Sequence, residues 1–353
     1  MKAKITRSRV VAALLLLALL VGGLAHAQAP DCGGVSRPIV FAEVDWDSVQ
    51  VINGIARTIL ELGFGCATDA IPGSTAPLLQ GAIRGDVDVT MEVWLDNSAD
   101  IWDPAVAAGT VEQLGVMFDD AVQAWYVPRY VVEGDPERGI EPMAPDLRSV
   151  FDLPRYAELF RDPERPELGR FHNCIIGWQC ELINTAKLHA YGLTEHFSDF
   201  RPGTSVALAS SMEGAYLRGD PWLGYYWAPT WVLGKLDMLR LEEPPYSDAC
   251  WARMVALMEA GTPELLEEAC AYPESTVVVG LGSRFKDEVS PEIKAFLTTM
   301  EMPSDRVSTL LAFMQDTDSG PMAAAQTFLR EQPEVWSAWL DDETAARVRA
   351  GLE

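Results

Sequence analysis

Short apolar runs alternate with amphipathic stretches along most of the chain. Four runs rich in β-branched and large apolar residues predict buried strands, at residues 38–42, 86–93, 123–128 and 222–227. Apolar positions at helical spacing predict helices over residues 49–62 and 76–84, and beyond residue 228 the pattern is largely helical. Strands that alternate with helices in this way predict an α/β fold.

Four tryptophans stand at the ends of these predicted elements. Trp46 follows the first strand, Trp94 ends the second, Trp227 ends the fourth, and Trp178 comes just before a helix predicted over residues 181–191. Residues at such junctions face the crevice in which open α/β sheets bind ligands. Each tryptophan alone also fits core packing. Together they predict an aromatic box for a methylated ammonium group, in which each cation–π contact contributes roughly 0.5–2 kcal/mol.

A short loop closed by two cysteines carries one of these tryptophans. Cys174 and Cys180 enclose it, and Trp178 stands beside the start of the helix. An indole face attracts a cation, and the backbone N–H groups of a helix N-terminus attract an anion. The loop is therefore suited to a zwitterion. The alternative is that the cysteines only staple a surface loop and that Trp178 packs into the core beneath it.

The first residues have the three parts of a secretory signal peptide. Basic residues precede an apolar run over residues 10–21, and Ala25-His26-Ala27 matches a cleavage site with small residues. No later stretch approaches the roughly 20 apolar residues that a membrane-spanning helix needs. We therefore predict a signal peptide over residues 1–27 and a soluble mature protein exported to a bacterial periplasm.

All six cysteines lie beyond the predicted cleavage site, which agrees with an oxidising compartment. Sequence alone leaves their pairing open. Proximity along the chain favours three disulfides, Cys32–Cys66, Cys174–Cys180 and Cys250–Cys270. The cysteines and histidines do not fall at the spacing of zinc ligands, so we expect no metal.

Charge and motifs narrow the function further. The formal net charge of -25 disfavours nucleic acid and anionic membranes as partners. The chain has no Gly-x-Ser-x-Gly elbow, no His-Glu-x-x-His pair and no phosphate-binding Gly-x-x-x-x-Gly-Lys loop. We therefore expect no cofactor and no catalysis, and we keep a secreted enzyme acting on a small methylated amine as the alternative.

The residues around the tryptophans resemble a known family, the periplasmic substrate-binding proteins of glycine betaine, choline and related osmolyte ABC transporters. The segment from Cys174 to Glu181 is similar to the family's disulfide-closed Gly-Trp-Gly-Cys-Glu loop, with Gln179 in place of a glycine. The segments 93–97 and 225–231 resemble the family's strand-end tryptophan and Tyr-Trp-Thr-Pro-His-Trp segments. The segment 85–89 is a less specific feature of binding proteins.

This resemblance implies a two-lobed periplasmic binding protein fold, type II-like, with two strands that cross a hinge. We expect lobe one to comprise residues 31–126 plus 228–353 and lobe two to comprise residues 127–227. The hinge then lies near residues 126–129 and 227–231. The resemblance also implies a monomer without catalysis, whose partners are a small methylated amine and the membrane permease of an ABC importer.

The resemblance further assigns roles at the site. It implies a cage of Trp94, Trp178 and Trp227, with Trp46 as a fourth wall similar to the choline-binding branch, and with the amides of Gln179 and Cys180 at the anionic end of the ligand. Glu92 and Tyr126 are further candidate ligand-binding residues, although a strand carboxylate such as Glu92 fits exposure to solvent equally well. The family's betaine binders often place a histidine after the strand-end tryptophan, where this chain has Asn97 and Ser98. Glycine betaine, trimethylamine N-oxide and choline therefore all remain candidate ligands.

Overall fold

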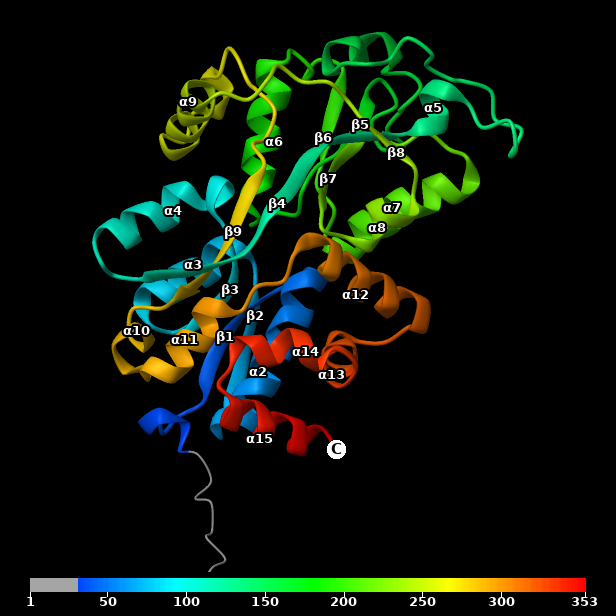
Figure 1. Ribbon diagram of the computed structural model, residues 1–353. Coiled ribbons are helices and arrows are strands. Elements are labelled where there is room, and N and C mark those ends of the chain that lie inside the picture. The colour runs from blue at the N-terminus through cyan, green and yellow to red at the C-terminus, as the bar shows by residue number, and fades with distance from the viewer. Residues whose placement is uncertain (1–30) are drawn as a thin grey trace, which may run out of the picture. The chain divides into compact units, whose positions relative to one another are not determined.

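The computed structural model describes residues 31–353, and the predicted signal peptide lies outside the described residues. Within residues 31–353, nine strands form one curled sheet in the order β2-β1-β3-β9-β4-β7-β5-β6, with β8 paired to β4 (Figure 1). Their bounds are β1 (Ile39–Val44), β2 (Thr68–Gly73), β3 (Val89–Trp94), β4 (Glu112–Pro128), β5 (Gly169–His172), β6 (Phe197–Phe200), β7 (Gly224–Ala228), β8 (Met238–Arg240) and β9 (Ser275–Leu281).

Helices connect and cover these strands. The α-helices are α2 (Asp47–Phe64), α3 (Thr75–Arg84), α4 (Leu95–Ala107), α5 (Arg129–Glu133), α6 (Gln179–Ala190), α7 (Ser205–Arg218), α8 (Trp231–Lys235), α9 (Asp248–Glu259), α10 (Phe285–Glu288), α11 (Pro291–Thr299), α12 (Ser304–Thr317), α13 (Pro321–Glu331), α14 (Pro333–Trp336) and α15 (Asp342–Leu352). The 3-10 helices are η1 (Cys32–Gly34), η2 (Val150–Tyr156), η3 (Pro263–Leu265) and η4 (Ser337–Trp339). Among the described residues, no helix is both long and apolar enough to cross a membrane.

The long strand β4 joins two segments of the sheet, because its partner changes along its length. Residues 112–121 pair with β9, and residues 122–126 pair with β7. We call β1, β2, β3 and β9, with the helices that pack on them, the first lobe. We call β5, β6, β7 and β8, with α6, α7 and α9, the second lobe. Figure 1 shows β4 running from one group of elements into the other.

The strand pairing differs from the lobe boundaries predicted from sequence. Strand β8 pairs with residues 126–128 of β4, and α9 packs against α6. Both elements therefore belong to the second lobe, although residues 228–353 are predicted for lobe one. The partner change in β4 also falls at residues 121–122, before the predicted hinge at 126–129. Pairing between distant segments leaves no mark in the local apolar pattern.

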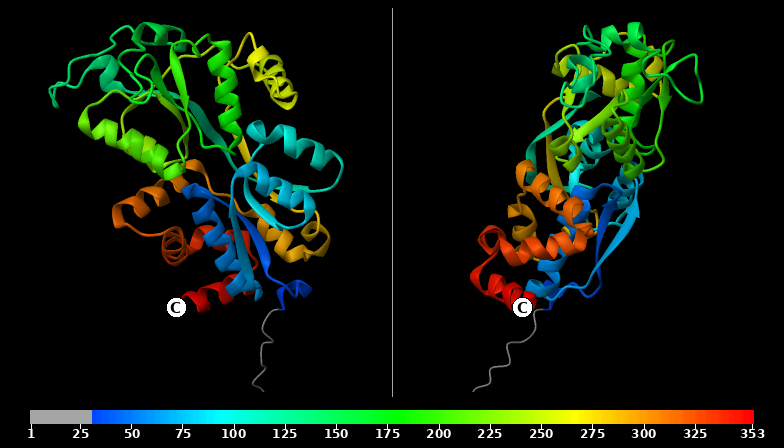
Figure 2. Two further views of the ribbon diagram at one scale, coloured as in Figure 1. Left: turned by 180° about the vertical axis from the view of Figure 1, so that it is seen from behind. Right: turned by 90° about the vertical axis from the view of Figure 1, so that its right-hand side faces the viewer.

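The first lobe forms because α2 presents a wide apolar face to the sheet. Val49, Ile52 and Ile59 are fully buried in the core. Gly65 ends the helix with φ 68°, a left-handed conformation that favours glycine. Helices α13 and α15 pack on α2 from the other side (Figure 2). Because β1 ends at Val44 and α2 begins at Asp47, the turn between them fixes the position of Trp46.

The three predicted disulfides are confirmed. Cys32–Cys66 ties η1 to the end of α2, Cys174–Cys180 closes the loop before α6, and Cys250–Cys270 anchors α9 to the segment that leads into β9. No cysteine in residues 31–353 is free. A covalent link that closes a loop reduces the conformational freedom of the unfolded chain, so each disulfide stabilises the element that it holds.

Candidate ligand-binding site

A pocket lies where the two lobes meet, near the ends of β1, β3 and β7. Its cavity volume is about 30 Å³, and the wider space between its walls, counted together with open solvent, is about 360 Å³. Both lobes line it, with Trp46, Thr75, Trp94, Asn97 and Ser98 from the first lobe and Trp178, Gln179, Cys180, Tyr225 and Trp227 from the second. The structure thus brings together the four tryptophans, Gln179 and Cys180 that the sequence predicts for one site.

The indole ring of Trp178 stands nearly perpendicular to those of Trp46 and Trp227. The ring of Trp178 lies 5.1 Å from that of Trp46 at an interplanar angle of 84°, and 5.1 Å from that of Trp227 at 83°. Trp94 lines the same pocket. We call Trp46, Trp94, Trp178 and Trp227 the tryptophan box. These edge-to-face contacts fix the relative orientation of the three rings, and indole faces that line a pocket are groups that can attract a cation.

A buried carboxylate holds the two first-lobe indoles. Glu92 Oε2 accepts hydrogen bonds from Trp46 Nε1 at 2.8 Å and from Trp94 Nε1 at 3.2 Å. Glu92 and Trp94 are two residues apart on β3, so their side chains leave the same face of the strand. Burial raises the pKa of Glu92 to about 7, although the hydrogen bonds from Trp46 and Trp94 oppose the rise.

The second-lobe side of the box is held by contacts with the first lobe. Trp178 Nε1 donates to Asp45 Oδ1 at 2.8 Å, and Gln179 Nε2 donates to Asp100 Oδ1 at 2.8 Å. Ser205 in α7 donates its hydroxyl to the backbone oxygen of Asp45. These hydrogen bonds join the two lobes around the pocket, so separating the lobes would break them.

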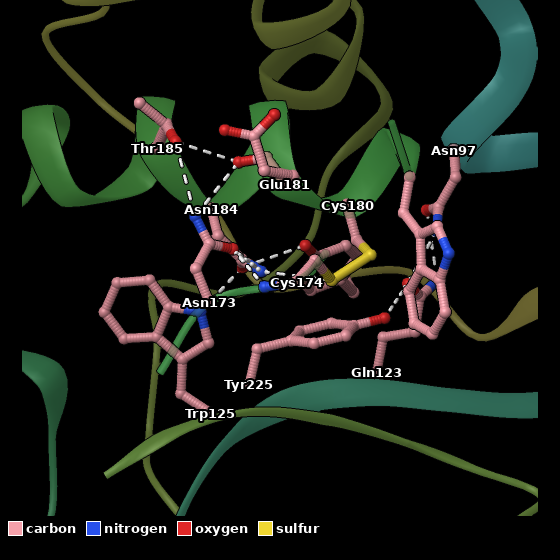
Figure 3. The surroundings of a disulfide bond; sticks show 12 residues. Asn97, Gln123, Trp125, Asn173, Cys174, Cys180, Glu181, Asn184, Thr185 and Tyr225 are labelled. Carbon is pink, nitrogen blue, oxygen red and sulfur yellow. Dashed lines mark hydrogen bonds between the residues drawn. A yellow bond between two sulfur atoms is a disulfide. The ribbon is translucent and has the colours of Figure 1, made fainter. Parts of the chain in front are cut away.

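Buried amides fix the disulfide loop that carries Trp178 (Figure 3). Asn173 Oδ1 accepts from the backbone N–H of Cys174 at 2.6 Å and from Asn184 Nδ2 at 3.0 Å. Asn184 Oδ1 in turn accepts from Trp125 Nε1 at 2.8 Å. Both asparagines are fully buried. The loop therefore enters α6 in a fixed orientation, with the first-turn N–H groups of the helix beside the box.

Neutral polar groups surround the remaining part of the pocket. Asn97 Nδ2 donates to Gln123 Oε1 at 2.7 Å, and the Tyr225 hydroxyl donates to the same oxygen at 2.7 Å (Figure 3). Ser98 is fully buried, and its hydroxyl has no hydrogen-bond partner within residues 31–353. A buried hydroxyl without a partner is costly. Ser98 is therefore a candidate to contact the oxygen atoms of a ligand.

Two predicted site residues do not line the pocket. Tyr126 is buried in the sheet, where it pairs with Gly224 of β7, and burial raises its pKa. Glu92 lies behind Trp46 and Trp94 instead of facing solvent, since only 2% of its surface is exposed. A strand pattern gives the face of a side chain but not what covers that face, which is why both roles were left open by the sequence.

Thr75 and Tyr225 line the pocket without being predicted as site residues. Tyr225 has a signal in the sequence, because it stands two residues before Trp227 on the same strand and so leaves the same face. Thr75 has none. It reaches the pocket because the backbone N–H of Ala76 donates to the carbonyl of Gly177 at 3.4 Å, which brings the start of α3 to the disulfide loop.

The fold and the pocket define a class of protein, the two-lobed binding proteins that hold a small ligand where the lobes meet. A choline-binding protein of an ABC transporter, in complex with choline, has a similar structure with 16% identity, a TM-score of 0.67 and coverage of 91% of this chain and 99% of that one. Lactococcal OpuAC, closed around glycine betaine, is similar with 15% identity, a TM-score of 0.64 and coverage of 86% and 100%. The glycine betaine/L-proline-binding protein ProX from Borrelia burgdorferi is similar with 14% identity, a TM-score of 0.66 and coverage of 88% and 100%.

A match to a family model shows the family of the chain. Residues 37–331 match the substrate-binding domain of ABC-type glycine betaine transport systems, and the chain belongs to this family. It is a substrate-binding protein of an ABC transporter, and the alternative of a secreted enzyme is not supported. As the binding component of an importer, it works outside the cytoplasmic membrane, in a periplasm or extracellular space.

Proposed function

We propose that the tryptophan box captures the trimethylammonium group of an osmolyte, with glycine betaine, choline and trimethylamine N-oxide as the candidates. The observation that carries this proposal is the perpendicular arrangement of Trp46 and Trp227 around Trp178. No lining residue of the pocket within residues 31–353 carries a formal charge. The indole faces are then the groups that attract a cation inside the pocket.

The oxygen-bearing end of the ligand is bound by neutral donors. The backbone N–H groups of Gln179 and Cys180 lie in the first turn of α6, where they have no acceptor within the helix. The hydroxyl of Ser98 lines the same pocket. An alcohol, an N-oxide or a carboxylate can accept from these donors. The similar structures that hold choline and glycine betaine support a ligand of this class.

The two lobes close on the ligand and open to release it to the membrane permease of an ABC importer. The hydrogen bonds from Trp178 and Ser205 to Asp45 form only when the lobes meet, and they support a closing motion about β4 and the segment before β9. The basic and apolar pattern of residues 1–27 supports export to the periplasm. A monomer is sufficient for this function, since one chain supplies all four walls of the box.

Calorimetric titration with glycine betaine, choline, carnitine and trimethylamine N-oxide tests the proposal. We expect saturable binding, with a one-to-one ratio, of at least one of the four. Ammonium and trimethylacetate are the controls, because one has charge without methyl groups and the other has methyl groups without a positive charge. The absence of binding to all four methylated amines would refute the proposal.

A further inference from the structure

Glu92 is the only group in the surroundings of the box that is acidic, fully enclosed and bonded to two of its walls in the described part of the chain. Its Oε2 accepts from the indole N–H groups of Trp46 and Trp94. Its Oε1 has no hydrogen-bond partner in residues 31–353. Holding two indoles needs only an acceptor, which a glutamine carbonyl or a backbone oxygen also provides. The negative charge of a carboxylate needs another explanation.

Burying that charge is unfavourable for the ligand-free protein. A carboxylate loses its hydration when it is enclosed, and no salt bridge within residues 31–353 involves Glu92. Elsewhere in the same lobe the buried Asp88 is ion-paired, with Arg37 at 2.5 Å and Arg284 at 3.4 Å. The two buried carboxylates thus differ in their compensation. Arg37 and Arg284 neutralise the charge of Asp88. Among the described residues Glu92 has no such partner, and it lies behind the tryptophan box, in which we propose that a cation binds.

We propose that Glu92 is a positioning residue that makes the first-lobe walls of the box selective for a positive charge. Its carboxylate orients the indoles of Trp46 and Trp94 through their N–H groups. It also draws the indole protons toward itself, which increases the electron density that the ring faces present to the ligand. A bound cation in turn offsets the unfavourable enclosure of the carboxylate. This inference rests on the proposed function, because it requires a cationic group in the box.

The test separates charge from shape. Each trimethylammonium ligand has an analogue of nearly the same shape, in which an uncharged tert-butyl group replaces the trimethylammonium group. Affinities of choline and of its tert-butyl alcohol analogue, and of glycine betaine and of its tert-butyl carboxylate analogue, are measured by calorimetry in the wild type and in Glu92→Gln at about pH 8.5, above the pKa of Glu92. Glutamine retains an acceptor for the indole N–H groups and removes the charge, with an NH2 group in place of the second oxygen.

We expect Glu92→Gln to lower the affinity for the trimethylammonium member of each bound pair by about tenfold. The affinity for the tert-butyl member should not fall by more than about twofold, because the shape of the box is kept. A loss that is equal for both members, or no loss for either, would overturn the role of Glu92. Glu43→Gln is the matched control. It removes one negative charge from neighbouring β1, where the carboxylate lies 3.9 Å from Arg57, and it should leave the charge preference intact.

Glu92→Asp covers the case in which the glutamine variant does not fold. The shorter carboxylate keeps the negative charge behind the same two indoles, so a retained preference for the trimethylammonium ligand supports the inference and a lost preference overturns it. Failure of the proposed function looks different. In that case the wild type itself binds neither choline nor glycine betaine, and the role of Glu92 falls with it.

Discussion

The two lobes hold their walls of the tryptophan box in different ways. In the first lobe, Trp46 and Trp94 donate their indole N–H groups to Glu92 within the same lobe. In the second lobe, Trp178 donates its indole N–H to Asp45, which belongs to the other lobe. The first pair is therefore fixed whether or not the lobes meet. The orientation of Trp178 is completed only by closure.

This difference implies that binding takes place in two steps. The ligand first contacts Trp46 and Trp94, which are already oriented in the first lobe. Closure then brings Trp178, Trp227 and the N–H donors of α6 into contact with it. Closure exchanges exposed polar groups for the hydrogen bonds to Asp45 and Asp100. The free energy of those contacts can offset the cost of holding the lobes together.

Removal of the second-lobe wall should have the largest effect. Trp178→Ala is expected to weaken binding of the native ligand by roughly 1–3 kcal/mol, about fivefold to 150-fold, because one cation–π face and its buried area are lost. Trp178→Phe should retain part of the affinity, since a benzene face still attracts a cation. Calorimetry measures both. Trp231→Phe is the control, because Trp231 does not line the pocket.

The charged and neutral analogues again show whether the box recognises charge or only shape. In the wild type the cation should bind far more tightly than its tert-butyl analogue, and Trp178→Ala should reduce that preference. Equal binding of both analogues by the wild type would show that the box recognises shape alone.

The first-lobe walls can be probed through the pH dependence of stability. The pKa of Glu92 is about 7 in the folded protein and 4.5 without the fold. The folded state thus binds the proton more tightly, so its stabilising effect is complete below pH 4.5 and is lost as the pH rises through 7. We expect the ligand-free protein to lose about 2 kcal/mol of stability between about pH 5 and 8 from this group.

Chemical denaturation at several pH values measures this loss. Burial also raises the pKa of Asp47 and of Asp96, which act in the same direction, so the difference between the wild type and Glu92→Gln isolates the part due to Glu92. A variant that shows the same pH dependence as the wild type would contradict a buried, titrating Glu92.

The site was more predictable from sequence than the arrangement that supports it. Trp46, Trp94 and Trp227 follow or end strong apolar strands, and Trp178 precedes a helix in a disulfide loop. These local patterns suffice to place the four residues at element ends. The first half of β4 escaped prediction, because residues 112–121 alternate irregularly between polar and apolar and pair with β9 through several register shifts.

Several features of the fold depend on contacts between residues distant in sequence, which the local apolar pattern does not show. In the region beyond residue 228, where the pattern is largely helical, residues 263–265 form only the short η3. Helix α4 was missed because Pro104 interrupts its pattern. Glu92 has the polar character of an exposed strand residue, and only the packing of Trp46 and Trp94 over it produces its burial. The assignment of β8 and α9 to the second lobe likewise depends on partners distant in sequence.

Substitution of Asp45 tests whether contact with the first lobe orients Trp178 of the second lobe. Asp45→Ala removes the acceptor for the Trp178 indole, and we expect it to weaken ligand binding by about 1 kcal/mol, roughly fivefold, through loss of one hydrogen bond to a carboxylate. Asp45→Asn retains an acceptor and should cost less. Small-angle scattering with and without ligand reports closure directly. If the radius and the shape of the protein are unchanged by saturating ligand, the closing model loses its main support.

Substitution of Tyr225 should have the smallest effect on affinity. It tests whether the second lobe binds the ligand through aromatic rings alone or also through a polar group. Its hydroxyl donates to Gln123 Oε1 at 2.7 Å, and that oxygen also accepts from Asn97 Nδ2 at 2.7 Å. The hydroxyl is therefore already engaged, and Gln123 keeps a donor when the hydroxyl is removed. Tyr225→Phe retains the ring that lines the pocket, so we expect it to lower the affinity by less than about 0.5 kcal/mol, roughly twofold.

Calorimetry with the native ligand decides the matter, with Tyr226→Phe as the control on the opposite face of β7. A loss above about tenfold in Tyr225→Phe alone would mean that the hydroxyl turns from Gln123 to the ligand on binding. The second lobe would then contribute a polar contact as well as aromatic faces. An effect near the expected twofold would mean that Ser98 and the first turn of α6 bind the oxygen-bearing end of the ligand instead. These donors line the same pocket and do not engage Gln123.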